Sequence, residues 1–214
     1  MKLIHSGTDL QHFWGEVSPS DHLVQIYEGE TRFLDSLEGF VAEGLRAGDG
    51  VVVIATQAHR AALDERLAAR GFNIDSLRSS DRYIALDARE TLSIFMVNAW
   101  PDEPLFAATV AGLLQKASAG HARRVRAFGE MVAVLWAEGH CGATVRLEHI
   151  WHRICATQGL SLLCAYPRSG FTGDVDASIR QICDAHSHVV ESHGLVPRAE
   201  NSMGALTRLL DSRA

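Results

Sequence analysis

The sequence predicts an α/β fold, a three-layer domain with a mainly parallel central sheet. Short apolar segments alternate with amphipathic segments of helical spacing along most of the chain, which is typical of strands joined by helices. The segment at 160–166 (LSLLCAY) is almost wholly apolar, as a central parallel strand is. With 214 residues and 47% hydrophobic content, the chain can bury roughly 70% of its unfolded surface in a single core.

The elements follow from apolar periodicity and from start and stop residues. Thr56 is a predicted helix N-cap, Gly71 a helix stop, and the two prolines at 101 and 104 open a helix. The predicted strands are 22–27, 51–55, 82–86, 124–128 and 160–166. The predicted helices are 33–45, 56–70, 91–100, 101–119, 131–137, 144–158, 174–193 and 202–212. The sequence thus divides into a lead-in segment at 1–20, a domain at 21–193 and a C-terminal tail helix within 194–214.

Composition excludes several classes of function. A formal charge of −6 argues against direct nucleic-acid binding, which requires a clustered basic face. Neither a signal peptide nor a long apolar run is recognisable, so membrane binding is not expected. The expected location is the cytoplasm, where cysteine thiols stay reduced. Cys183 and His186 share a helical face near His188 and His193, but this spacing is a weak metal signal. We therefore expect no metal and no cofactor.

The segment from Tyr27 to Arg32 (YEGETR) lies between the first strand and the first helix, where a phosphate-binding loop is expected. Such a loop needs glycines and a lysine that neutralises the phosphate oxygens. The chain has only two lysines, Lys2 and Lys116, and the segment carries Glu28 and Glu30 instead. We therefore expect that the chain does not hydrolyse nucleotides and is not an enzyme.

Glu130 directly follows the predicted strand 124–128, at the edge of a parallel sheet where ligands bind. With Glu28 it would form the floor of a polar pocket. The alternative is that Glu130 caps the following helix, where an acid complements the helix dipole. The sequence leaves both interpretations open.

Glu148 and Trp151 are neighbours on the predicted helix 144–158. A buried glutamate beside tryptophan could donate a hydrogen bond to a neutral ligand, but the favoured interpretation is a salt bridge with Arg32 or Arg126. Four aromatic side chains are candidates for lining an apolar ligand pocket, although most such stripes belong to the core. These residues are Tyr27, Phe128, Trp136 and Trp151. Cys164, within an apolar strand, is predicted to be a buried inert thiol.

Several segments together resemble the MEDS-type sensory domain. The matching segments are HLVQIYE at 22–28, FVAEGL at 40–45, VVVIAT at 51–56 with His59, FGEM at 128–131, LW at 135–136, LE at 147–148 with Trp151, and LCAYP at 163–167. The resemblance covers about residues 20 to 190 and implies a relative of the RecA/KaiC-like ATPases with a degenerate phosphate loop. It also implies a role in bacterial signal transduction, since the family occurs in a dichloromethane-responsive regulator and beside histidine-kinase modules.

These observations predict a non-enzymatic sensory or regulatory domain. The expected ligand-binding residues are Tyr27, Glu28, Arg32, Glu130, Trp136, Glu148 and Trp151. The expected partners are a small organic molecule and a separate signalling protein, such as a histidine kinase or a transcription regulator, with a homodimer as a further arrangement. Two alternatives remain, a nucleotide-binding protein that uses Arg32 and backbone amides, and an adaptor that binds proteins alone.

Overall fold

The computed structural model describes residues 14–171, 175–191 and 194–197. Its strands in the main sheet are β1 (His22–Tyr27), β2 (Gly50–Ala55), β3 (Tyr83–Asp87), β6 (Val125–Gly129), β7 (Ser161–Pro167), β8 (His188–Glu191) and β9 (Gly194–Pro197). Its helices are α2 (Glu30–Ala47), α3 (Gln57–Ala69), α4 (Ile74–Ser79), α5 (Ala88–Phe95), α6 (Glu103–Ala117), α7 (Met131–Ala137), α8 (Cys141–Gln158) and α9 (Val175–Asp184). A small hairpin, β4 (Met96–Val97) and β5 (Trp100–Pro101), and a 3-10 turn, η1 (Arg168–Gly170), complete the described chain.

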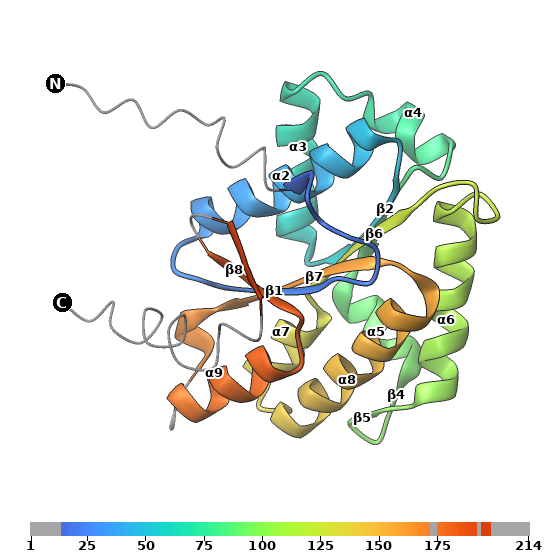
Figure 1. The fold of residues 1–214 in the computed structure, drawn as a ribbon. Helices are drawn as coiled ribbons and strands as arrows, with labels where there is room; N and C mark the ends of the chain where they lie inside the picture. The colour runs from blue at the N-terminus through green and yellow to red at the C-terminus, as the bar shows by residue number, and fades with distance from the viewer. Residues whose placement is uncertain (1–13, 172–174, 192–193, 198–214) are drawn as a thin grey trace, which may run out of the picture.

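The described residues form a seven-stranded sheet in the order β3-β2-β6-β7-β1-β8-β9. Neighbouring strands from β3 to β8 pair in parallel, and β9 alone in this sheet runs antiparallel, against β8. Figure 1 shows α2, α3 and α4 on one face and α5 to α9 on the other. The three-layer α/β fold with a mainly parallel sheet is therefore confirmed.

Two apolar layers hold the helices on the sheet. On one face, side chains of α2 such as Phe33 and Phe40 pack with Val53, Phe128 and Leu163 of the sheet. On the other face, α5 to α9 pack on side chains of opposite orientation from the same strands, because successive residues of a strand point to opposite faces. Both layers are fully buried, which explains the almost continuous apolar sequence of the central strands.

The end of the lead-in segment is fixed to the first layer. Trp14 is 1% exposed and packs edge-on against Phe40, with 5.4 Å between the ring centroids. The Arg126 guanidinium donates to the Trp14 carbonyl oxygen at 2.9 Å and to the Asp49 carboxylate at 2.9 Å. A side chain at Gly39 would collide with the Trp14 ring, since a Cβ there would lie 2.5 Å from its Nε1. Trp14 is therefore a core residue, and Phe13 lies outside the described residues.

Three predicted helices need correction. The helix expected at 33–45 begins at Glu30, so residues 30–32 are its first turn and not a loop. The helix expected at 91–100 is α5 followed by the β4–β5 hairpin, whose tip residues Asn98 and Ala99 both have positive φ. Within the helix expected at 174–193, the described residues form α9 and then β8. The tail helix expected at 202–212 lies outside the described residues.

Candidate functional site

The chain connections diverge between the paired strands β2 and β6 at their carboxyl ends, and this place at the sheet edge is called the crevice below. The chain leaves β2 toward α3 on one face and leaves β6 toward α7 on the other face, although the two strands pair directly. In parallel sheets, ligands bind at such points because the two connections diverge. Thr56 follows β2 and Glu130 follows β6, so the crevice brings these two residues together.

The carboxylate of Glu130 is held across this crevice. One oxygen accepts a hydrogen bond from the Thr56 backbone N–H at 2.8 Å, and the other lies 2.8 Å from Nδ1 of His59 in the first turns of α3. Glu130 occupies the N-cap position of α7, but its side chain makes no capping hydrogen bond. Glu130 is thus the N-cap residue of α7, as the second interpretation expects, but its carboxylate makes its hydrogen bonds with Thr56 and His59.

His59 links Glu130 to the first turn of α2. Its Nε2 lies 2.6 Å from a carboxylate oxygen of Glu30, so the imidazole stands between two carboxylates. Burial lowers the pKa of His59, but the hydrogen bond and negative charge of Glu130, together with Glu30, outweigh burial and raise it above 6.5. This row, Glu30–His59–Glu130, is called the edge row below.

Aromatic rings form the inner wall behind the edge row. Phe33 stacks on Tyr27 with 4.6 Å between the ring centroids and meets the His59 ring edge-on at 4.8 Å. Burial raises the pKa of the Tyr27 hydroxyl, and the charges of Glu130 and Glu30 raise it further. Tyr27 therefore stays a neutral hydroxyl beside the two acids.

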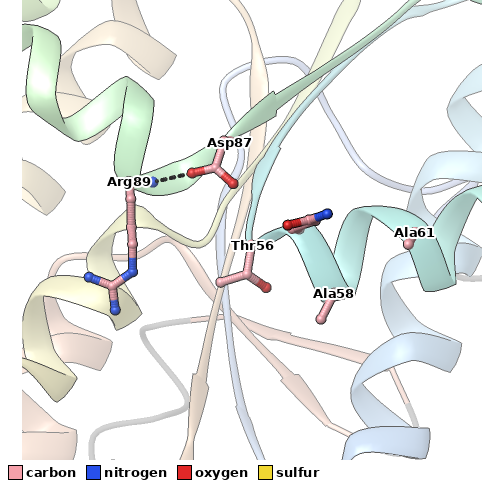
Figure 2. Close-up of a pocket in the computed structure, with 6 residues that line it drawn as sticks. Thr56, Ala58, Ala61, Asp87 and Arg89 are labelled. Carbon is pink, nitrogen blue, oxygen red and sulfur yellow. Dashed lines mark hydrogen bonds between the residues drawn. The ribbon is translucent and has the colours of Figure 1, made fainter.

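An open hollow of about 600 Å³ adjoins Thr56 at the ends of β2 and β3. Figure 2 shows Thr56 and Ala58 on one side and Asp87 with Arg89 on the other. Asp87 caps α5 by accepting hydrogen bonds from the backbone N–H groups of Arg89 and Glu90, and its other oxygen binds Arg60 at 2.9 Å. These bonds lower the pKa of Asp87, with the backbone N–H of Glu90 contributing most. The hollow thus has an acid that stays ionised and an exposed cation, Arg89, whose guanidinium pairs with the Glu138 carboxylate.

The predicted site residues divide between this edge and other places. Tyr27 ends β1, Glu28 follows it and Glu130 follows β6, so all three lie at the same edge of the sheet, with β7 between the two strands. Glu28 pairs at 3.2 Å with Arg168, which follows β7, and not with Glu130. Arg32 is exposed on the first turn of α2.

The predicted aromatic pocket is not one cavity. Tyr27 and Phe128 belong to the layer beneath α2, whereas Trp136 and Trp151 belong to the layer on the opposite face. Trp136 donates to the Gly170 carbonyl oxygen at 3.1 Å, and Trp151 meets Phe106 edge-on at 4.9 Å. The sheet separates the two pairs, so they cannot line one pocket.

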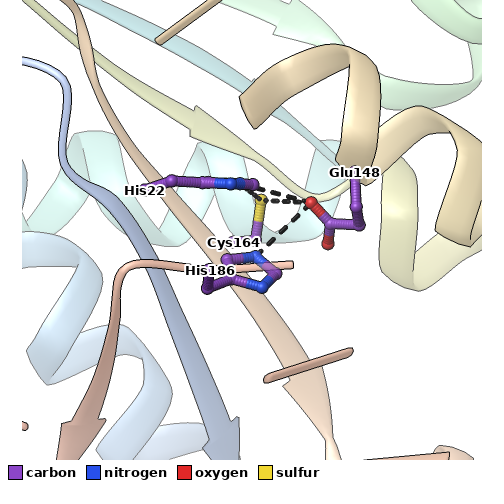
Figure 3. Close-up of side chains that lie close together, drawn as sticks. All are labelled: His22, Glu148, Cys164 and His186. Atoms are coloured by element: carbon purple, nitrogen blue, oxygen red, sulfur yellow. Dashed lines mark hydrogen bonds and ion pairs between the residues drawn. The ribbon is translucent and has the colours of Figure 1, made fainter. Parts of the chain in front are cut away.

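Glu148 lies in the core of the second face, fully buried, and pairs with no arginine among the described residues. Its carboxylate lies between His22 of β1 and His186, which follows α9, with Cys164 of β7 beside it (Figure 3). The expected salt bridge with Arg32 or Arg126 is wrong, because Arg126 binds Asp49 on the other face.

Burial sets the charges in this core cluster. It lowers the pKa of His22 to about 4, with His186 adding to the effect, so the ring is neutral at pH 7. Burial would raise the pKa of Glu148, but the facing His186 and His22 lower it below its ordinary value. Burial also raises the pKa of the Cys164 thiol well above its usual range, in line with its predicted lack of reactivity.

Sequence reasoning missed Thr56, His59 and His22 as site residues, and it considered His186 only with Cys183, as a weak metal signal. Thr56 and Glu130 occupy equivalent positions, each directly after a strand, which is a usable signal. That signal points to a single site only if β2 and β6 are adjacent, and local sequence does not determine the order of strands in a sheet.

Fold and site together define the class of protein, an α/β domain that gathers polar side chains at the carboxyl-terminal edge of a parallel sheet. The family model described as "MEthanogen/methylotroph, DcmR Sensory domain" (MEDS) matches residues 21–187, so the chain belongs to this family. Family membership indicates a sensory role in signalling. A comparison with curated proteins found no match. No helix within the described residues has both the length and the apolar character needed to cross a membrane.

Proposed function

We propose that this domain is a non-enzymatic sensor that binds a small organic molecule at the crevice between β2 and β6. The observation that carries the proposal is the carboxylate of Glu130, which holds the N-terminus of α3 through the Thr56 N–H and His59 beside an open hollow. The hollow, about 600 Å³, lies within the range of roughly 300–1,000 Å³ that ligand pockets occupy. Its lining offers Asp87 and Arg89 as charged partners for a ligand with hydrogen-bonding groups.

The same contacts provide a mechanism for signalling. A ligand that competes for the Thr56 N–H or for Glu130 would favour a different position of the start of α3 relative to α7. A ligand shifts such an equilibrium only by its difference in affinity for the two arrangements. The output then passes to a separate signalling protein, such as a histidine kinase or a transcription regulator.

A catalytic role with nucleotides has little physical support at this edge. Glu30 occupies the first turn of α2, where a nucleotide-binding protein would hold phosphate, and its carboxylate adjoins His59. Adding a triphosphate would place like charges together. Arg32, the cation that the nucleotide alternative requires, lies two residues further along α2 and is exposed.

One observation favours a protein partner as a second function. Four large apolar side chains between the end of α5 and the start of α6 are 45–56% exposed: Ile94, Val97, Trp100 and Leu105. Exposed groups of this kind often mark protein contacts. An adaptor role would use this surface and leave the crevice without a ligand.

A thermal-shift screen tests the proposal. The probes are one- to four-carbon alcohols, amines, carboxylic acids and halogenated hydrocarbons, with magnesium ATP as a separate probe. A ligand at 100 times its Kd stabilises by about 2.7 kcal/mol, which raises the melting temperature of a domain of this size by roughly 5–10 °C. We expect such a shift in the wild type and in Glu43→Gln, a control on the solvent side of α2, and its loss in Glu130→Gln.

Two outcomes would contradict the proposal. A shift with magnesium ATP that Arg32→Ala abolishes would identify a nucleotide site instead. If no probe shifts the wild type and native mass spectrometry of protein from its own host shows a stable protein complex without a small molecule, the adaptor function is favoured.

A further inference from the structure

The core cluster of His22, Glu148, Cys164 and His186 has the composition and the geometry of a closed metal site. The four side chains come from β1, α8, β7 and the turn after α9, and each is at most 1% exposed. Their ligand atoms all lie within 4.8 Å of one another. Figure 3 shows the two rings and the thiol directed at the same carboxylate.

Both histidine rings are oriented by backbone carbonyl groups. Nδ1 of His22 lies 3.2 Å from the Ala185 carbonyl oxygen, and Nδ1 of His186 lies 2.7 Å from that of Ile182. A carbonyl oxygen only accepts, so each Nδ1 carries a hydrogen and Nε2 is the ring nitrogen that faces the carboxylate. Histidines that bind metals are held in this way, with the second nitrogen donating to a carbonyl or carboxylate.

The polar atoms of the cluster converge on one carboxylate oxygen. Oε2 of Glu148 faces Nε2 of His22 at 3.3 Å, Nε2 of His186 at 3.4 Å and the Cys164 sulfur at 3.5 Å. Although it is buried, Nε2 of His186 makes no hydrogen bond of ordinary geometry. The other oxygen of Glu148 is satisfied separately by the Tyr166 hydroxyl, which donates to it. Buried polar atoms without good hydrogen bonds are costly, and a central cation bound by all four side chains would remove this cost.

The separations fit coordination better than hydrogen bonding. A charge-assisted N–H···O bond is about 2.7–2.9 Å long, which is shorter than both contacts of Oε2 with the rings. A tetrahedral zinc ion with bonds of about 2.0–2.1 Å to N and O and about 2.3 Å to S sets its ligands roughly 3.4 Å (N to O) and roughly 3.6 Å (S to N or O) apart. The observed values are 3.3 and 3.4 Å for N to O, 3.6 Å for S to N and 3.5 Å for S to O.

We propose that this cluster binds one Zn²⁺ ion through Nε2 of His22, Nε2 of His186, one oxygen of Glu148 and the sulfur of Cys164. Two nitrogens, an oxygen and a sulfur in tetrahedral array suit zinc, and four protein ligands leave no open position, as in structural sites. On binding, Zn²⁺ replaces the thiol proton of Cys164, which leaves to solvent. The ion, one thiolate and one carboxylate then sum to zero charge, which a site excluded from water requires.

The site lies apart from the crevice of the proposed function. It fastens the turn between α9 and β8 to β1, α8 and β7, which places the late strand β8 beside β1. Zinc would therefore act on the stability of the domain, and the test can succeed or fail whatever binds at the sheet edge.

Metal analysis of the whole chain, purified without a histidine tag, tests the proposal. We expect about one zinc ion per chain when the metals released by acid are measured by elemental mass spectrometry. After the metal is removed with a chelator, added Co²⁺ should give the strong visible absorption of a tetrahedral site and a thiolate-to-cobalt band in the near ultraviolet. Cys164→Ala should abolish the thiolate band, while Cys155→Ala, which removes another buried thiol, should keep it.

Affinity measurements separate the cluster from other histidines. His22→Gln and Cys164→Ala should weaken zinc binding by at least about 100-fold, more than the loss of an outer-shell contact costs. His152→Gln, next to His22 but exposed, should leave it unchanged. The proposal is overturned if the chelator-treated wild type stays folded and binds neither ion, or if it binds them no better than Cys164→Ala does. The wild-type measurements decide this even if a variant fails to fold.

Discussion

Two clusters in this domain combine histidine with glutamate. They differ in the ratio of imidazole rings to carboxylates and in exposure to water. In the edge row, one ring, His59, stands between two carboxylates at 2.6 and 2.8 Å, and the outer acid, Glu30, has a side chain that is 58% exposed. In the core cluster, two rings flank one carboxylate at 3.3 and 3.4 Å, and all three side chains are 0% exposed.

This difference decides the charge of the ring. Two carboxylates and partial hydration favour the imidazolium, so the pKa of His59 is raised although burial opposes this. In the dry core, burial favours the neutral ring and lowers the pKa of His22 to about 4. Histidine therefore favours its protonated form at position 59 in the edge row and its neutral form at position 22 in the core. The first arrangement suits a polar contact that a ligand can exchange, and the second suits a metal ion.

The largest expected difference between the core cluster and the edge row is in stability, when the glutamate of each loses its charge but keeps its shape. We expect Glu148→Gln to lower the free energy of unfolding by about 3–5 kcal/mol, because it leaves buried groups without their partner. Glu130→Gln should cost about 1–2 kcal/mol, since an amide oxygen can still accept from the Thr56 N–H. Urea unfolding of zinc-saturated protein measures both values.

Glu43→Gln, which removes an acid of an ordinary surface pair with Arg46, serves as the control and should change stability by less than about 0.5 kcal/mol. Equal losses for Glu148→Gln and Glu130→Gln would mean that the two acids have equivalent environments, contrary to the distinction made above.

A smaller effect, on zinc affinity, is expected from the residue that orients Glu148 in the core cluster. The Tyr166 hydroxyl donates to the Glu148 oxygen that faces away from the rings. Tyr166→Phe should weaken zinc binding about 10–100-fold, the usual effect of losing a group that orients a metal ligand. Competition with a chromophoric chelator measures this affinity.

Tyr83→Phe is the matched control, because Tyr83 is equally buried and donates to Asp64 on the other face of the sheet. We expect it to leave zinc affinity unchanged. A similar loss of affinity in both variants would show that the Tyr166 hydroxyl acts only through general stability.

The sequence predicted the fold well where a single element carries the signal. The strand at 22–27 is found as predicted, and Leu147, Ile150 and Trp151 face the core as their spacing indicates. Failure occurred where tertiary contacts override local pattern. The apolar run 91–100 resembles a helix, but the chain reverses at Asn98 and Ala99, two residues with positive φ that composition does not mark. Residues 188–191 pair with β1, which turns a predicted helix into a strand.

The candidate sites were harder to predict because their residues come from distant segments. Glu130 was recognisable from its place after a strand, but its partners Thr56 and His59 depend on the adjacency of β2 and β6. His22 looked like the first residue of a buried strand, and Glu148 was assigned an arginine partner. The core cluster requires four segments to be assembled first, so neither the helical spacing of Cys183 and His186 nor any short motif reveals it.

The smallest expected effect is the pH dependence of the edge row. Glu30 from α2, Glu130 at the start of α7 and the hydroxyl of Tyr27 are the ionisable groups that surround His59. Because the folded-state pKa of His59 is raised above its unfolded value of 6.5, its stabilising effect is fully present below pH 6.5 and is lost as the pH rises through the folded-state value. The difference in unfolding free energy between the wild type and His59→Gln should therefore shrink as the pH rises above 6.5, as urea unfolding can show. In Glu30→Gln, with one carboxylate fewer, the loss should be smaller and complete at a lower pH. If the difference instead stays constant or grows with pH, His59 is neutral at the edge as His22 is in the core, and the two clusters do not differ in charge.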